Sequence, residues 1–192
     1  HAGEIGEICV RGDVVMKGYW NNPDASAESL KGGWLHTGDI GEIDEDGYIC
    51  ITDRKKDIIV NSGGDNIAPQ RVEGMLTIEP EIAQAMVYGD KQPHLVALIV
   101  PDADFTTDWF KANGDEKCEL ADLIEDEKFV ASIREALDRV NSRLNTIERV
   151  RRFKLIAEPF SIDNEMLTPS MKIRRHVIKG RYGDDLEALY GS

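Results

Sequence analysis

The chain has 192 residues, of which 41% are hydrophobic and 31% are charged, and its formal net charge at pH 7 is −13. This composition is typical of one or two globular domains and excludes a disordered or collagen-like chain. The negative charge argues against a general nucleic-acid-binding protein, which needs clustered positive charge. The longest apolar run, residues 95–100, is far shorter than the ~20 residues that cross a bilayer, so no transmembrane segment is predicted.

Residues 1–52 are predicted to be rich in β-structure. Residues 4–11 alternate between apolar and polar side chains, as a half-buried strand does. Residues 40–51 contain two short apolar runs around an acidic turn that ends in glycine, which predicts a β-hairpin. A short helix is predicted over residues 23–30, because Asn22 suits the N-cap position and proline suits the first helical position. The chain begins with a histidine inside a predicted strand, which suggests a piece of a longer protein.

Residues 53–192 mix helices and strands, which predicts a compact α+β domain with its boundary at residue 53. The run 95–100 is apolar enough to be a central strand. Residues 128–144 place apolar side chains at spacings of three and four, as an amphipathic helix does. The predicted elements are strands at 57–60, 82–88, 95–100 and 150–157, helices at 69–79, 105–113 and 128–144, an irregular stretch at 158–171, and a short final helix near 185–189.

The cysteine and histidine residues give no sign of a metal site. The three cysteines, at positions 9, 50 and 118, are widely spaced and form no CxxC pair, so neither a zinc site nor a disulfide framework is predicted. The small, odd number of widely spaced cysteines fits a reducing, cytosolic compartment. His36, His94 and His176 have no second histidine or cysteine at a useful spacing, and each is interpreted as a surface or turn residue.

Two charged positions in the first third of the chain allow a functional and a structural interpretation. Asp39 follows a glycine at a loop–strand junction, where its carboxylate could accept hydrogen bonds from a diol such as ribose, or could cap its own turn. The charged run 53–57 (DRKKD) is either a solvated connection or a hinge between two units, in which Arg54 could bind a nucleotide.

Two further positions lie in polar loops. Gly63 and Gly64 lack the lysine and hydroxyl residue of a P-loop, but adjacent glycines allow a narrow ligand to approach the backbone, or simply form a tight turn. Lys172 follows a proline-containing turn, and its ammonium could neutralise phosphate and carboxylate oxygens, or could be an ordinary surface charge. Basic residues are concentrated after residue 139, so a phosphorylated ligand would prefer that part of the chain.

Each of these motifs is weak evidence alone, but their order along the chain is specific for one family. The chain contains WLHTGDIG at 34–41, DGY at 46–48, DRKKD at 53–57, GGDNIAP at 63–69 and SMKIRR at 170–175. This succession resembles the C-terminal part of the adenylate-forming enzymes, which include acyl-CoA synthetases, peptide-synthetase adenylation domains and luciferases. The glycine loop and the ending LTPSMK look most like the long-chain fatty acid–CoA ligase branch.

The resemblance implies an α+β fold, in which a small mixed lid domain over residues 53–192 follows the all-β end of a large AMP-binding domain over residues 1–52. It also implies two half-reactions, in which a carboxylate attacks the α-phosphorus of ATP and the thiol of CoA then displaces AMP. In the first, Asp39 would bind the ribose hydroxyls, Arg54 would contact ribose or phosphate, and Lys172 would bridge the substrate carboxylate and the α-phosphate.

For the second half-reaction, the resemblance implies a rotation of the lid about Asp53 that brings the loop of Gly63 and Gly64 to the CoA channel. From charge alone, the basic residues between Arg149 and Lys154, together with Arg174 and Arg175, are expected to meet CoA phosphates. The implied ligands are fatty acid, ATP or AMP, CoA and Mg²⁺, with the metal ligand and the acyl pocket in a preceding N-terminal domain. The fragment alone is therefore expected to be inactive, and no residue of it is assigned to a metal.

Two alternatives to a long-chain ligase stay open at this point. One is another branch of the same family, a short-chain or medium-chain acyl-CoA synthetase or a peptide-synthetase adenylation domain. The other is a module that binds nucleotide or CoA without catalysis, although the presence of Asp39, Arg54 and Lys172 together argues against it. The expected location is the cytoplasm, with peripheral attachment to a membrane left open.

Overall fold

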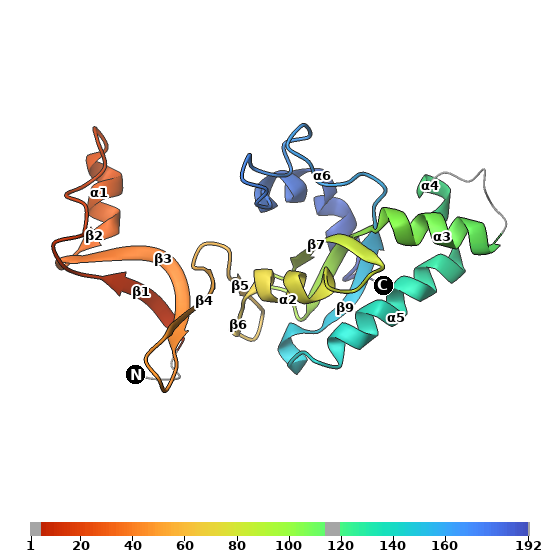
Figure 1. Ribbon diagram of the computed structural model, residues 1–192, viewed down its shortest axis with the longest axis horizontal. Coiled ribbons are helices and arrows are strands. Elements are labelled where there is room, and N and C mark those ends of the chain that lie inside the picture. Colours follow the sequence, from red (N-terminus) through yellow and green to blue (C-terminus); the bar gives the residue numbers. More distant parts are fainter. Residues whose placement is uncertain (1–4, 114–119, 192) are drawn as a thin grey trace. The chain divides into compact units, whose positions relative to one another are not determined.

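The computed structural model describes residues 5–113 and 120–191, with only the backbone of Asp53 and Asp122. It divides into two compact units, His1–Ile58 and Ile59–Ser192, called here the N-terminal unit and the C-terminal unit (Figure 1). In the described residues no helix combines the length and the apolar character needed to cross a membrane.

The N-terminal unit is an antiparallel sheet built around one long strand. Its elements are β1 (Gly6–Val10), α1 (Pro23–Ser29), β2 (Leu30–Lys31), β3 (Trp34–Ile43) and β4 (Ile49–Arg54). β3 pairs with each of the other three strands. Asp44 Oδ1 accepts hydrogen bonds from the backbone N–H groups of Asp46 and Tyr48, which closes the predicted hairpin. The predicted helix is also confirmed, because Asn22 Oδ1 accepts a hydrogen bond from Ala25 N at 3.1 Å.

The C-terminal unit combines a three-stranded sheet with helices. Its strands are β5 (Ile59–Val60), β6 (Asn66–Ile67), β7 (Ile82–Tyr88), β8 (Leu95–Pro101) and β9 (Val150–Leu155). Its helices are α2 (Pro69–Leu76), α3 (Ala103–Asn113), α4 (Leu120–Leu123), α5 (Glu127–Asn141), the 3₁₀ turn η1 (Thr146–Glu148) and α6 (Arg175–Ala188). β5 and β6 form a separate two-stranded hairpin. In the larger sheet the order is β7-β8-β9, antiparallel between β7 and β8 and parallel between β8 and β9.

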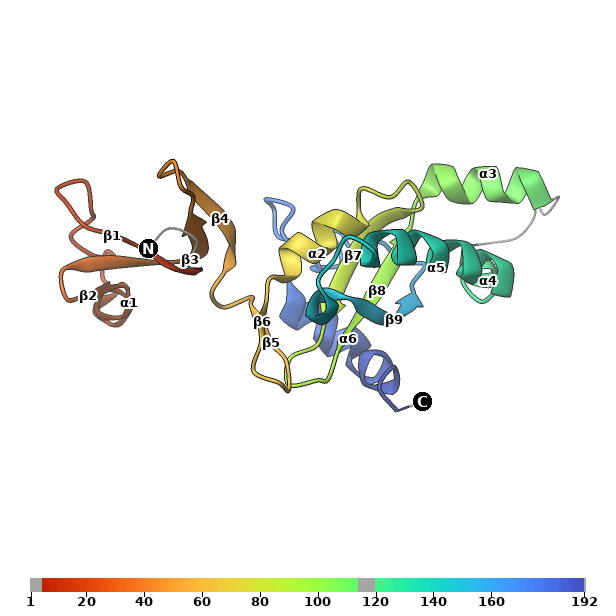
Figure 2. The same cartoon turned by 90° about the horizontal axis from the view of Figure 1, so that it is seen from below.

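β8 is the central strand, as predicted, and it separates two hydrophobic cores. Its side chains alternate between the two faces of the sheet, which is the period of a strand. Leu95, Ala97 and Ile99 pack with residues of α2 and α5, whereas the intervening apolar residues pack with residues of α6 and of the segment 156–167. α5 and α6 thus cover opposite faces of the sheet (Figure 2).

The final helix is longer than predicted. α6 begins at Arg175, about ten residues before the predicted helix near residue 185, and its backbone departs from helical geometry at Tyr182 (φ −112°, ψ 16°). Gly180 and Gly183 weaken the local helix propensity, which explains why the sequence pattern indicated only the last turns. Ile178 and Leu186 are fully buried in the core beside β8, so packing holds the helix together.

Candidate functional site

Asp39 and Arg54 lie side by side in the N-terminal unit. They are Cα partners in the pairing of β3 with β4, although they are 15 positions apart in the sequence. Arg54 Nε is 2.8 Å from Asp39 Oδ1, and the two side chains are 46% and 27% exposed. The pair presents a carboxylate that can accept hydrogen bonds from hydroxyl groups beside a guanidinium that can bind phosphate.

The backbone just before Asp39 lies within β3 and not at the predicted loop–strand junction, and a residue with no predicted role holds it in place. Gly38 adopts a φ of 73°, a conformation that glycine takes without strain, and donates its N–H to Glu7 Oε1 at 3.2 Å. Glu7 Oε2 also lies 3.0 Å from Lys55 Nζ. Hydrogen bonds from His36 and then from Lys55 lower the pKa of Glu7 to about 2. Glu7 therefore carries a full negative charge at neutral pH and holds the Gly38 backbone of β3 from the neighbouring strand β1.

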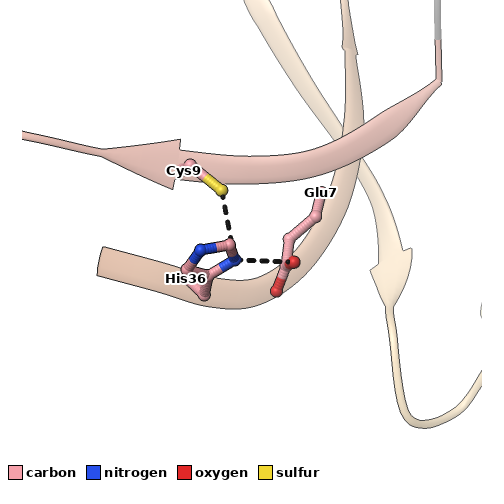
Figure 3. A group of neighbouring side chains, drawn as sticks. All are labelled: Glu7, Cys9 and His36. Atoms are coloured by element: carbon pink, nitrogen blue, oxygen red, sulfur yellow. Dashed lines mark hydrogen bonds and ion pairs between the residues drawn. The ribbon is translucent and has the colours of Figure 1, made fainter. Parts of the chain in front are cut away.

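Glu7 also belongs to a cluster with Cys9 and His36 (Figure 3). Cys9 and His36 are Cα partners in the pairing of β1 with β3, and Glu7 is two positions before Cys9 on β1. The donor atoms of the three side chains all lie within 4.8 Å of one another. Residue spacing gave no sign of this cluster, because the strand pairing joins positions that are 27 apart.

Asp53 is the residue before Arg54 in β4, and its Cα partner is Ile40. The boundary between the two units follows Ile58, five residues after Asp53. The hinge at Asp53 and the predicted domain boundary at that residue both stay predictions.

Gly63 and Gly64 form the exposed tip of the β5–β6 hairpin. Asn61 Oδ1 accepts hydrogen bonds from the backbone N–H groups of Gly63 and Asp65, both at 2.9 Å, and so holds the loop closed. Gly64 has a φ of 86°, and a Cβ atom added there would meet no atom within 4 Å. Backbone conformation alone therefore requires glycine at this position.

Replacing Gly64 with alanine is expected to lower the free energy of unfolding by roughly 1–2 kcal/mol, because a Cβ atom disfavours the left-handed backbone. Gly74→Ala is the matched control. It lies within α2, where an added Cβ atom also has open space, and it should raise stability by about 0.5–1 kcal/mol. Urea unfolding of both variants measures the difference, and a loss of stability in both would contradict the conformational explanation.

Lys172 lies in a short, ordered loop of the C-terminal unit. Thr168 N donates to Lys172 O at 2.8 Å, Lys172 N donates to Thr168 Oγ1 at 3.1 Å, and Met171 takes a φ of 60°. Leu167 and Ile173 form an antiparallel bridge at the base of the loop. The Lys172 side chain is exposed and has no hydrogen bond or ion pair with the rest of the described chain. An ordered backbone thus presents a solvated ammonium.

A buried ion pair fastens this loop to α2. Arg175, three residues after Lys172, donates from both terminal nitrogens to the carboxylate of Glu73, at 2.7 and 2.6 Å. Glu73 also accepts a hydrogen bond from Val87 N at 2.8 Å, and its side chain is 8% exposed. The guanidinium of Arg175 is therefore engaged within the fold, and the charge-based expectation that it meets a CoA phosphate stays a prediction.

The five predicted site residues with described side chains divide between the units. Asp39 and Arg54 belong to the N-terminal unit, whereas Gly63, Gly64 and Lys172 belong to the C-terminal unit. Glu7 and Glu73 are recognisable only from the tertiary contacts, and so is the positioning role of Arg175.

The comparisons with known proteins agree on one family. Residues 56–192 match the family described as AMP-binding enzyme C-terminal domain. The long-chain-fatty-acid–CoA ligase FadD15 of Mycobacterium tuberculosis is 40% identical over 186 residues, which are 96% of this chain and 31% of that protein. Human long-chain-fatty-acid–CoA ligase 1 is 37% identical over 97% of this chain and 27% of its own. This chain thus spans about a third or less of the length of these relatives.

A solved structure has a similar fold. The A domain of a carboxylic acid reductase from Segniliparus rugosus, in complex with AMP and a co-purified carboxylic acid, matches with a TM-score of 0.80 and 27% identity. The match covers 97% of this chain and 28% of that one. The predicted α+β fold class is confirmed.

Proposed function

This chain belongs to the family of AMP-binding enzyme C-terminal domains, and we propose that it forms the C-terminal part of an AMP-forming long-chain fatty acid–CoA ligase. In the proposed reaction, a fatty acid carboxylate attacks the α-phosphorus of ATP and releases diphosphate. The thiol of CoA then attacks the acyl carbonyl, loses its proton and releases AMP. The names of the curated relatives support this branch over the alternatives within the family.

The observation that carries the proposal is the position of Lys172. An exposed ammonium at the tip of an ordered loop can reach a ligand outside its own unit without first losing an internal partner. Negative charge spreads over the carboxylate and phosphate oxygens as the adenylate forms, so a positioned cation stabilises the transition state more than the separated reactants. Lys172 is therefore the proposed catalytic residue of the first step.

Asp39 and Arg54 are proposed to hold the nucleotide. The carboxylate of Asp39 accepts hydrogen bonds from the two ribose hydroxyls, and Arg54 contacts ribose or phosphate. The 2.8 Å contact between the two side chains supports this role, because each orients the other. Both side chains are partly exposed, so a ligand has access to them.

The second step is proposed to use the loop of Gly63 and Gly64. With the lid rotated about Asp53, this loop lines the channel for the pantetheine arm of CoA, where the missing side chains leave room for a thin ligand. The exposed position of both glycines at the hairpin tip supports this role.

Mg²⁺, which the family implies, is not assigned to residues of this chain. In the described ranges, the one group of three His, Cys, Asp or Glu side chains that could share a metal ion is Glu7, Cys9 and His36. Its sulfur and nitrogen donors do not suit Mg²⁺, which prefers oxygen ligands in octahedral geometry. We therefore propose that Mg²⁺ and the acyl chain bind in a preceding N-terminal domain.

The test uses the full-length protein with ATP, Mg²⁺, CoA and fatty acids of graded chain length. We expect acyl-CoA, AMP and diphosphate in equal amounts, with highest kcat/KM for long chains, and no turnover by residues 1–192 alone. Preference for short acids would contradict the long-chain branch. Transfer to a carrier protein but not to CoA would indicate a peptide-synthetase domain, and inertness with every acid would indicate a binding module.

A further inference from the structure

We propose that Glu7, Cys9 and His36 of the N-terminal unit form a binding site for one thiophilic divalent cation such as Zn²⁺. The cluster offers one sulfur, one nitrogen and one oxygen donor from two paired strands (Figure 3). Zn²⁺ accepts this mixture of ligands, whereas Mg²⁺ and Ca²⁺ prefer oxygen alone. The inference is independent of the proposed ligase activity.

Two of the three donor–donor distances are close to those of a tetrahedral site, and the third lies within 4.8 Å. His36 Nδ1 lies 3.5 Å from Cys9 Sγ and 3.0 Å from Glu7 Oε2. In a tetrahedron with Zn–S of ~2.3 Å and Zn–N of ~2.05 Å, sulfur and nitrogen are ~3.5 Å apart. The nitrogen–oxygen distance expected in the same geometry is ~3.3 Å, about 0.3 Å longer than the one observed.

The surroundings hold the ligands in place. Cys9 and His36 lie opposite each other in the sheet, so the strand pairing sets the distance between their backbones. Glu7 Oε1 accepts a hydrogen bond from Gly38 N at 3.2 Å, which orients the carboxylate and leaves Oε2 to face His36 Nδ1. Such outer hydrogen bonds to a ligating carboxylate are a regular feature of metal sites.

One positive charge competes with a bound cation. Lys55 Nζ lies 3.0 Å from Glu7 Oε2, but its side chain is 63% exposed and can turn into solvent when a metal ion takes its place. The His36 side chain is 34% exposed, so water has access to complete the coordination. On binding, the metal–sulfur bond forms as the Cys9 thiol releases its proton to the buffer, His36 binds through Nδ1 with its ring proton on Nε2, and no electron is transferred.

Co²⁺ is the probe for the test, because a tetrahedral Co²⁺–thiolate site gives visible d–d bands and a near-ultraviolet sulfur-to-cobalt charge-transfer band. The reduced full-length protein is titrated with CoCl₂ without added thiols. We expect one Co²⁺ per chain with both features, and displacement of the Co²⁺ by Zn²⁺. The C9S variant should lose the charge-transfer band and bind at least tenfold more weakly.

C50S is the matched control, because Cys50 is a free, exposed cysteine on β4, outside the cluster. It should retain the wild-type spectrum and affinity. H36Q should keep the sulfur band but bind at least tenfold more weakly, and circular dichroism verifies that each variant is folded. Absence of both spectral features in the wild type, equal binding by C9S and C50S, or loss of the band in C50S would overturn the proposal.

Discussion

Replacing Lys172 with alanine in the full-length protein is expected to slow adenylate formation by about 10²- to 10³-fold, the usual effect of removing one positioned donor from a charged transition state. The thioester step should keep nearly its full rate when acyl-adenylate is supplied, because the proposed rotation of the lid removes Lys172 before CoA attacks. Single-turnover measurements of diphosphate release and of acyl-CoA formation separate the two steps.

Lys128→Ala is the control for this variant. Lys128 is an exposed lysine at the start of α5, in the same unit, so its removal makes the same change in net charge. It should leave both steps unchanged. An equal loss in both steps of Lys172→Ala would argue against the assigned role, as would unimpaired adenylate formation.

Replacing Glu73 with alanine is expected to lower the free energy of unfolding of the C-terminal unit by about 3–5 kcal/mol. The change leaves the guanidinium of Arg175, only 22% exposed, without its carboxylate and removes the acceptor of the Val87 N–H group. Because Arg175 follows Lys172 closely in the chain, we also expect the lysine loop to become less well ordered. Urea unfolding monitored by circular dichroism gives the energy.

Asp108→Ala provides the comparison for Glu73→Ala. Asp108 pairs with Lys111 on the surface of α3, where both side chains are more than half exposed. Breaking such a pair should cost no more than ~1 kcal/mol. A similar loss in the free energy of unfolding for both variants would show that burial does not strengthen the Glu73–Arg175 pair, which would contradict the expected difference.

Much of the local structure could be predicted because it depends on neighbouring residues. The N-cap of Asn22, the acidic turn of the hairpin and the amphipathic period of α5 each arise within one element. The run 95–100 could be recognised as central because both faces of the strand are apolar. The succession of motifs along the chain also indicated the family, because the residues in these motifs are determined by the reaction and not by packing.

Only the tertiary structure decided which distant side chains meet. Strand pairing joins Asp39 to Arg54 and Cys9 to His36, and helix packing joins Glu73 to Arg175 across 102 positions. Spacing along a chain cannot reveal such contacts, because they depend on register and on the packing of separate elements. The length of α6 was missed for the same reason. Its glycines disfavour a helix locally, and the buried contacts of Ile178 and Leu186 with the core overcome that preference.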